Sequence, residues 1–162
     1  MSRPTIAITK FVGVCSLGLL TGISFSTSYA SVKSLLTLPS APAAHRSFKN
    51  LMTNLEILTT PLTVITTFSL LTSYYLSPPS QKHPYLIFTS VIPLLSGVYS
   101  FAILSPKAAR MEKLIRENGE KGVNGEELRN GMVEWESASW GITGMSGLAF
   151  AMGVVGIWGD GS

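Results

Sequence analysis

Glu56 is an acidic residue at the start of a long apolar segment, and hydroxyl side chains follow it at helical spacing. These are Thr59, Thr60, Thr63 and Thr67. Because a carboxylate in lipid is costly, an intramembrane acid is a candidate functional residue. We take Glu56, Thr63 and Tyr74 as a candidate intramembrane polar site, lining a pocket between helices. Alternatively, Glu56 lies among the lipid headgroups, near Arg46 or Lys49.

Other residue types that perform catalysis or bind metals are sparse. His45 and His83 fall in loops predicted on opposite faces of a membrane, so they cannot share a metal ion within one chain. The single cysteine, Cys15, excludes an internal disulfide and a cysteine-based zinc site, and its apolar neighbours predict that it packs as a small hydrophobe. The sequence contains no Ser–His–Asp set or phosphate-binding loop. We expect no catalytic residues, no cofactor and no metal.

The charged residues are few and unevenly placed along the 162 positions. They make up 13% of the chain, against about 25% in a typical soluble domain. Thirteen of them lie between Lys107 and Glu136. The surface of a soluble domain needs charge throughout, and disorder needs a lower hydrophobic share than the 46% found here. With a net charge of +3 and no basic run, nucleic-acid binding is also not expected.

Four uncharged stretches of 22 to 25 residues account for the low charge: 11–32, 57–81, 84–106 and 137–159. A helix needs about 20 residues to cross a hydrocarbon core of ~30 Å. The pattern therefore predicts an all-α membrane protein, a four-transmembrane-helix bundle forming one membrane domain over residues 1–162. The predicted spans cover about 8–32, 53–76, 84–105 and 136–158. A soluble four-helix bundle, the alternative, would need charged outer faces that these segments lack.

Small residues indicate where the helices pack. Gly18 and Gly22 form a small-xxx-small pair, and glycines recur through the fourth span. We interpret both as packing faces within the bundle, with a homo-oligomer through Gly18 and Gly22 as the alternative. Ser28-Tyr29-Ala30 resembles a signal-peptide cleavage site, so removal of residues 1–30 is a further alternative. The apolar stretch is longer than a signal peptide needs, which favours an uncleaved first span.

The connections between the spans differ in character. Residues 33–49 predict an extended loop that ends at Ser47 as the N-cap of the second helix. Residues 77–84 form a tight proline-rich turn, whereas Pro61 and Pro93 lie inside spans and are expected to kink them. Three tryptophans near the ends of the fourth span predict interfacial aromatic positions: Trp135, Trp140 and Trp158.

The charged segment 107–135 is the predicted exposed loop. Opposite charges four residues apart support a helix that continues the third span to about Asn118. Asn-Gly pairs at 118–119, 124–125 and 130–131 predict turns or helix stops, leaving a short helical turn at 126–129 capped by Asn124. The candidate interaction residues on this loop are Arg110, Lys113, Arg116, Glu117 and Glu120.

Basic residues predict the orientation in the membrane. Nine lie on the side of the first and third loops and three on the side of the termini and second loop. The positive-inside rule places loops 1 and 3 in the cytosol and the termini away from it.

Three short segments resemble a small fungal family of mitochondrial outer-membrane proteins that act in mitophagy, the autophagy-related protein 33 family with its cell-division-cycle-suppressor paralogue. The segments are Ala7-Ile8-Thr9-Lys10, Gly18-Leu19-Leu20-Thr21-Gly22 and His83-Pro84-Tyr85-Leu86. The resemblance implies a multi-pass protein of the mitochondrial outer membrane that supports selective autophagy of mitochondria. It implies no catalytic residues, and its partners would be the lipid bilayer, autophagy machinery or other outer-membrane proteins.

A direct autophagy receptor would expose an aromatic-x-x-aliphatic segment. Phe48-Lys49-Asn50-Leu51 fits this pattern but is basic and adjoins the membrane, so we interpret it as a chance match. We therefore expect a non-enzymatic facilitator that acts through its charged loop. Two alternatives remain: a small four-helix membrane enzyme or lipid/quinone-binding protein, since the layout is similar to that of anthrone oxygenases, and a structural subunit of a larger complex.

Overall fold

The computed structural model describes residues 3–79 and 82–159, apart from the side chains of Arg3, Glu120 and Lys121. Nearly all of these residues are helical, and none of those described forms a β-strand. The α-helices are α1 (Arg3–Ser26), α2 (Val32–Leu35), α3 (Ala41–Leu76), α4 (Tyr85–Tyr99), α5 (Ser105–Gly122) and α6 (Gly125–Gly159). Two π-helical turns, η1 (Thr27–Ser31) and η3 (Ser100–Leu104), join α1 to α2 and α4 to α5. The predicted all-α fold is confirmed.

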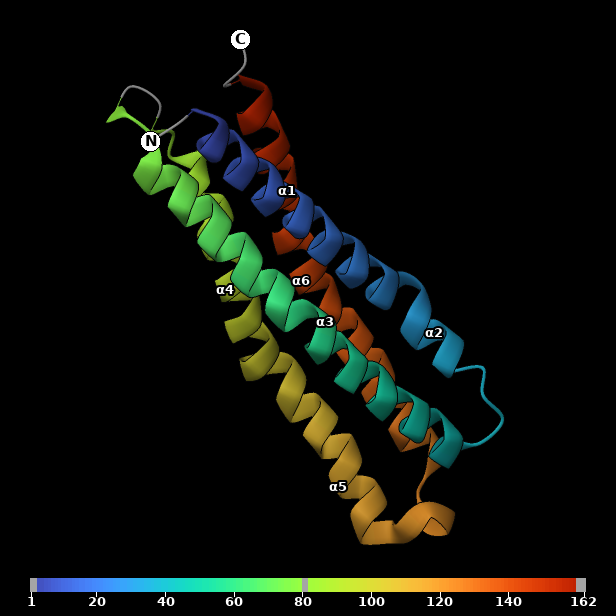
Figure 1. Cartoon of the computed structure of the whole chain (residues 1–162). Helices are drawn as coiled ribbons and strands as arrows, with labels where there is room; N and C mark the ends of the chain where they lie inside the picture. Colours follow the sequence, from blue (N-terminus) through green and yellow to red (C-terminus); the bar gives the residue numbers. More distant parts are fainter. Residues whose placement is uncertain (1–2, 80–81, 160–162) are drawn as a thin grey trace.

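Within the described residues, four continuous helical rods are long and apolar enough to cross a membrane. They cover Pro4–Leu35, Ala41–Leu76, Tyr85–Gly119 and Gly125–Gly159. The rods lie side by side in Figure 1, with α1 packed on α3 and α6, and α4 packed on the same two helices. The start of α1, the end of α6 and the α3–α4 connection share one end of the bundle. The other two connections lie at the opposite end.

The rods are longer than a bilayer requires. α3 has 36 residues and α6 has 35, so each measures about 50 Å at 1.5 Å per residue. A hydrocarbon core of about 30 Å leaves roughly 20 Å of each helix outside it. Most of the charged residues lie at the end with the α2–α3 and α5–α6 connections. We call α2, residues 41–55 of α3, α5 and residues 125–136 of α6 the charged head.

The charged head has its own hydrophobic core. Its buried side chains are Val32, Ala44, Phe48, Leu104, Met111, Leu128, Met132 and Trp135. The segment 107–135, predicted to be an exposed loop, is therefore mostly helical. Its first part extends the rod of α4 and its second part begins the rod of α6. Both parts pack against α3. The interfacial position expected for Trp135 is wrong, because its side chain is only 4% exposed. The sequence places Trp135 near the end of the fourth span, but that position does not show which face of α6 the side chain occupies.

Two helix boundaries also differ from expectation. α3 begins six residues before Ser47, with the Ser40 hydroxyl accepting from the Ala43 amide and a proline in the first turn. The predicted stop at Asn130-Gly131 is wrong, since α6 continues through it. A Cβ at residue 131 would lie 2.8 Å from Met111, so glycine serves close packing here. The expected cap is present, with Asn124 Oδ1 accepting from the Glu126 amide at 3.0 Å.

The other half of the bundle has apolar side chains on its outer face. Exposed large hydrophobic residues include Phe11, Leu19, Ile57, Phe68, Phe101, Leu148 and Val155. Cys15 is also exposed, which corrects the expectation that it packs inside. A small core of Val14, Leu70 and Leu86 fills the interior near the α3–α4 connection. An apolar exterior around a partly polar interior suits lipid as the solvent.

Candidate functional site

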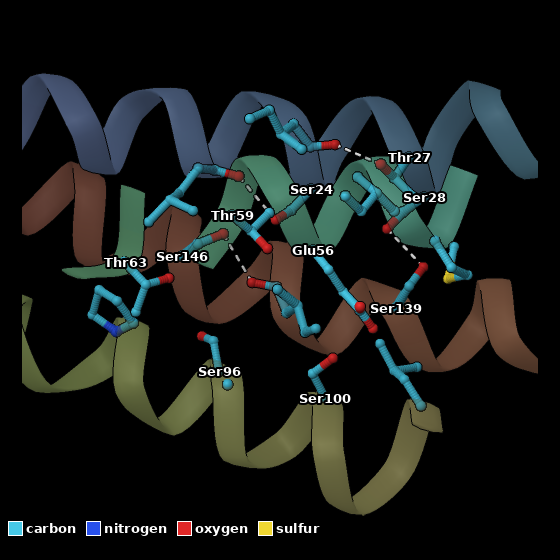
Figure 2. Close-up of a pocket in the computed structure, with 18 of the residues that line it drawn as sticks. Ser24, Thr27, Ser28, Glu56, Thr59, Thr63, Ser96, Ser100, Ser139 and Ser146 are labelled. Atoms are coloured by element: carbon cyan, nitrogen blue, oxygen red, sulfur yellow. Dashed lines mark hydrogen bonds between the residues drawn. The ribbon is translucent and has the colours of Figure 1, made fainter. Parts of the chain in front are cut away.

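A cavity of about 200 Å³ lies between the four rods, on the side of the bundle nearest the charged head. α1 with η1, α3, α4 with η3 and α5, and α6 all contribute to its wall. Figure 2 shows hydroxyl groups from all four sides converging on it. The labelled hydroxyl residues are Ser24, Thr27, Ser28, Thr59, Thr63, Ser96, Ser100, Ser139 and Ser146. The rest of the wall is mainly aliphatic, including Leu17, Leu20, Met52 and Ile142.

Both π-helical turns border the cavity. Thr27 and Ser28 belong to η1, and Ser100 and Leu104 belong to η3. A π turn inserts one extra residue into an α-helix and changes the direction of the side chains that follow, and such turns are frequent at functional sites. The two turns therefore set which faces of the first and third rods turn toward the cavity.

Glu56 projects from α3 into this cavity (Figure 2). It is the one Asp, Glu, Lys, Arg or His residue in the described wall. Across the described part of the chain, no side chain forms an ion pair or hydrogen bond with its carboxyl group. Lys49, one of the two cations expected near it, instead bonds to Glu112. Glu56 is therefore an unpaired acceptor at the cavity.

The structure brings two of the three predicted polar-site residues together. Glu56 and Thr63 both line the cavity, two turns apart on α3. Tyr74 does not, because it lies 18 residues beyond Glu56, or about 27 Å along the helix. Its ring packs beside the core of Val14, Leu70 and Leu86 and meets the Tyr75 ring edge to face at 5.8 Å.

Most of the cavity hydroxyls were not singled out from the sequence. A signal for them existed in their spacing, since Ser24, Thr27 and Ser28 share one helix face, as do Ser96 and Ser100, and Ser139 and Ser146. A single polar face on each span does not reveal that the four faces meet. That relation requires the order in which the helices pack.

Hydroxyl hydrogen bonds connect each pair of neighbouring rods. Thr9 and Ser73 join α1 to α3 at 2.6 Å, and Thr67 donates to the Ser90 carbonyl of α4 at 3.2 Å. The Tyr99 hydroxyl donates to the Ala138 carbonyl of α6 at 3.0 Å. The fourth connection is made by Ser28, whose hydroxyl lies 2.8 Å from that of Ser139 and 3.1 Å from that of Thr143. Such bonds replace the hydrophobic drive that is missing between helices in lipid.

Ion pairs also connect the helices of the charged head. The pairs are Lys33–Glu136, Lys49–Glu112, Lys107–Glu134 and Arg110–Glu127, with Lys113–Glu117 within α5. The Lys49 ammonium lies 2.7 Å from the Glu112 carboxylate, and this contact lowers the pKa of Glu112 below its usual value. Lys113, Arg116 and Glu117 remain exposed on α5. The side chain of Glu120 lies outside the described part of the structure.

The described residues contain no group of three or more histidine, cysteine or acidic side chains that could hold a metal ion. The cavity therefore offers hydrogen-bond acceptors and apolar surface, and the head offers a surface of mixed charge.

Comparison with known proteins identifies relatives along nearly the whole chain. The sequence model of a family described as Autophagy-related protein 33 matches residues 1–137. A protein named Autophagy-related protein 33 from Gibberella zeae is 34% identical over 184 aligned positions, covering 98% of this chain and 93% of that protein. No solved structure matches. The resemblance noted in three short segments thus extends from end to end, and the chain belongs to the autophagy-related protein 33 family.

Proposed function

We propose that this chain is an integral protein of the mitochondrial outer membrane that supports selective autophagy of mitochondria. It does so without catalysis, by presenting its charged head to other proteins. The observation that carries the proposal is membership of a family whose relative is named for autophagy, over nearly the full length of both chains. The exposed charged surface of α5 supplies the means of recognition.

The distribution of charge supports an orientation with the charged head in the cytosol. Nine of the 12 basic residues lie at that end of the bundle. The helices extend about 20 Å past the hydrocarbon core there, which lifts α5 and the start of α6 beyond the lipid headgroups. A cytosolic partner would meet Arg110, Lys113, Arg116 and Glu117 first.

The separation of core and surface residues in the head explains why the α5 surface suits recognition. The residues that form the core of the head, such as Phe48 of α3 and Met111 of α5, are buried, whereas Lys113, Arg116 and Glu117 are exposed. The surface charges can therefore be changed while the core is kept. Because electrostatic complementarity contributes mainly to specificity and association rate, a mixed-charge surface suits reversible recruitment.

Homo-oligomerisation through Gly18 and Gly22 would be a separate property. Gly18 lies under Phe150 of α6 within the same chain, while a Cβ at Gly22 would meet nothing within 4 Å. A second copy could therefore use Gly22 more readily than Gly18.

The test replaces the α5 surface and keeps the core, with K113S, R116S and E117Q combined in one variant. In fungal cells lacking the native protein, this variant should insert normally but reduce delivery of mitochondria to the vacuole to the level of the deletion. A mitochondrial fluorescent reporter that is processed in the vacuole measures that delivery. The control variant, K82S, changes an exposed cation at the opposite end and should behave as the native protein. Unchanged mitophagy in the triple variant would overturn the role of the head.

A further inference from the structure

We propose that the cavity around Glu56 binds the polar end of a single-chain membrane amphiphile that carries an ammonium group and hydroxyls, and that it rejects phosphate. This inference is independent of the proposed role in autophagy. It rests on three features of the cavity: the direction in which its hydroxyls donate, the charges in its wall, and the side on which it opens.

Five of the cavity hydroxyls donate to carbonyl oxygens within their own helices. Ser24 donates to the Leu20 carbonyl at 2.9 Å, Thr27 to Ile23 at 2.8 Å, and Ser96 to Ile92 at 3.0 Å. On α6, Ser139 donates to the main-chain carbonyl of Glu136 at 2.6 Å, and Ser146 donates to that of Ile142 at 2.9 Å. A hydroxyl that donates in this way keeps oxygen lone pairs available as acceptors. These five hydroxyls and the Glu56 carboxyl group make the wall rich in acceptors, so it suits a ligand that donates several hydrogen bonds.

The charge in the wall favours a cation. Glu56 adds the strongest acceptor, and no Lys, Arg or His lines the cavity among the described residues. An anionic phosphate would meet the carboxyl group with no compensating cation in the described wall, which is unfavourable in a low-dielectric site. An ammonium group beside Glu56 would instead form a charge-assisted hydrogen bond.

The exposed part of the wall shows where a ligand enters. Glu56, Gly97 and Ser105 are the exposed wall residues, and they belong to α3 and to the α4–α5 rod. The described wall residues of α1 and α6 are buried or half-buried. The cavity therefore opens sideways between α3 and the α4–α5 rod. Its length from Trp135 to Ser146 corresponds to about 16 Å of helix, reaching from the head into the apolar half.

The volume and the apolar wall define the rest of the ligand. About 200 Å³ is too small for a whole membrane lipid but accommodates a polar end and the first part of one chain. The aliphatic wall residues, such as Leu20 and Ile142, suit the start of an alkyl chain, which can leave through the opening into the bilayer. A long-chain amino alcohol has this combination of donors, charge and single chain.

The experiment uses the full chain in lipid nanodiscs and a photoreactive sphingosine as the probe. We expect saturable labelling, with cross-linked residues on α3 and on the α4–η3 segment. Unlabelled sphingosine should compete, ceramide should compete weakly because it has hydroxyls without the ammonium, and sphingosine 1-phosphate should not compete. Labelling that does not saturate, labelling mapped elsewhere, or equal competition by the phosphate would overturn the proposal.

Two variants with matched controls test the wall. Glu56→Gln keeps the shape and removes the charge, and should weaken binding about tenfold, in line with the loss of a hydrogen bond to a charged group. Glu126→Gln changes an exposed head residue and should bind as the native chain does. Gly97→Leu adds an isobutyl side chain at the opening, where a Cβ meets nothing within 4 Å, and should abolish labelling. Gly144→Leu is the control and should leave labelling unchanged, because a Cβ at Gly144 also meets nothing within 4 Å but the residue does not line the cavity.

These outcomes separate the two proposals. Native labelling in the Glu56→Gln or Gly97→Leu variants would overturn the binding site without bearing on the α5 surface. Loss of mitophagy in the α5 triple variant with labelling intact would support the role of the head alone.

Discussion

Trp135 of α6 meets Phe48 of α3 edge to face inside the charged head, with ring centroids 5.3 Å apart and ring planes at 87°. Both side chains are almost fully buried, at 4% and 2% exposure. The contact joins residues 41–55 of α3 to residues 125–136 of α6. The head therefore has a packed centre of its own, separate from the small core near the α3–α4 connection.

Trp135→Ala should loosen the head. Removing a buried tryptophan costs about 3–5 kcal/mol, because the apolar contact is lost and a cavity remains. We expect faster hydrogen exchange in residues 41–55 and 125–136, with little change in the apolar half of the bundle. Trp158→Ala is the matched control, since Trp158 is 79% exposed. Equal effects from the two variants would contradict the packed head.

Ser28→Ala should weaken the contact between the first and fourth rods. The Ser28 hydroxyl reaches both Ser139 and Thr143, and interhelical hydrogen bonds in membrane proteins contribute about 0.6 kcal/mol each on average. We therefore expect a loss of about 1 kcal/mol in the free energy of unfolding, measured by titration with a denaturing detergent. Ser34→Ala, which removes a hydroxyl bonded within its own helix, is the control. In the double variant with Ser139→Ala, the two losses should be less than additive.

Gly156→Ala should strain the packing of α4 on α6. A Cβ at this position would overlap the Tyr85 ring, so the ring must move. Overpacking of this kind costs about 1–3 kcal/mol. Gly144→Ala is the comparison, because a Cβ there meets open space and alanine favours the helix. A detergent titration of both variants measures the difference, and equal stability would contradict the packing described for Gly156.

Impermeant thiol reagents should label the head in intact mitochondria. With Cys15 replaced by serine, the variant Glu126→Cys presents a thiol at the end of the bundle proposed to face the cytosol, whereas Lys82→Cys presents one at the opposite end. We expect immediate labelling of the first and labelling of the second only after the outer membrane is permeabilised. The reverse pattern would invert the proposed topology while leaving the fold intact.

The fold could be predicted largely from charge, because burying charges in lipid is so costly that their absence marks each span. The residue at which α3 begins could not be predicted in this way. Residues 41–49 are polar enough to be read as a loop, and only the core formed by Ala44 and Phe48 shows why they are helical. The same holds at Asn130-Gly131, where packing against Met111 outweighs a local helix-stop signal.

Glu56 and Thr63 could be recognised as site candidates because they share one face of one helix. Tyr74 shares only its polarity with them. It lies 18 residues beyond Glu56 on α3, which places it far from the cavity. The serines from the other three rods depend on packing order and on two π-helical turns, neither of which a local sequence pattern encodes. The acceptor-rich character of the cavity follows only from observed donor directions.

The uninterrupted course of α3 and α6 from the charged head into the apolar half of the bundle has a mechanical consequence. With no flexible joint between the two parts, a load applied at Arg116 acts on the whole bundle as on a lever. A partner that pulls on the head sideways would tilt the four helices together, and the opening of the cavity between α3 and the α4–α5 rod would move with them.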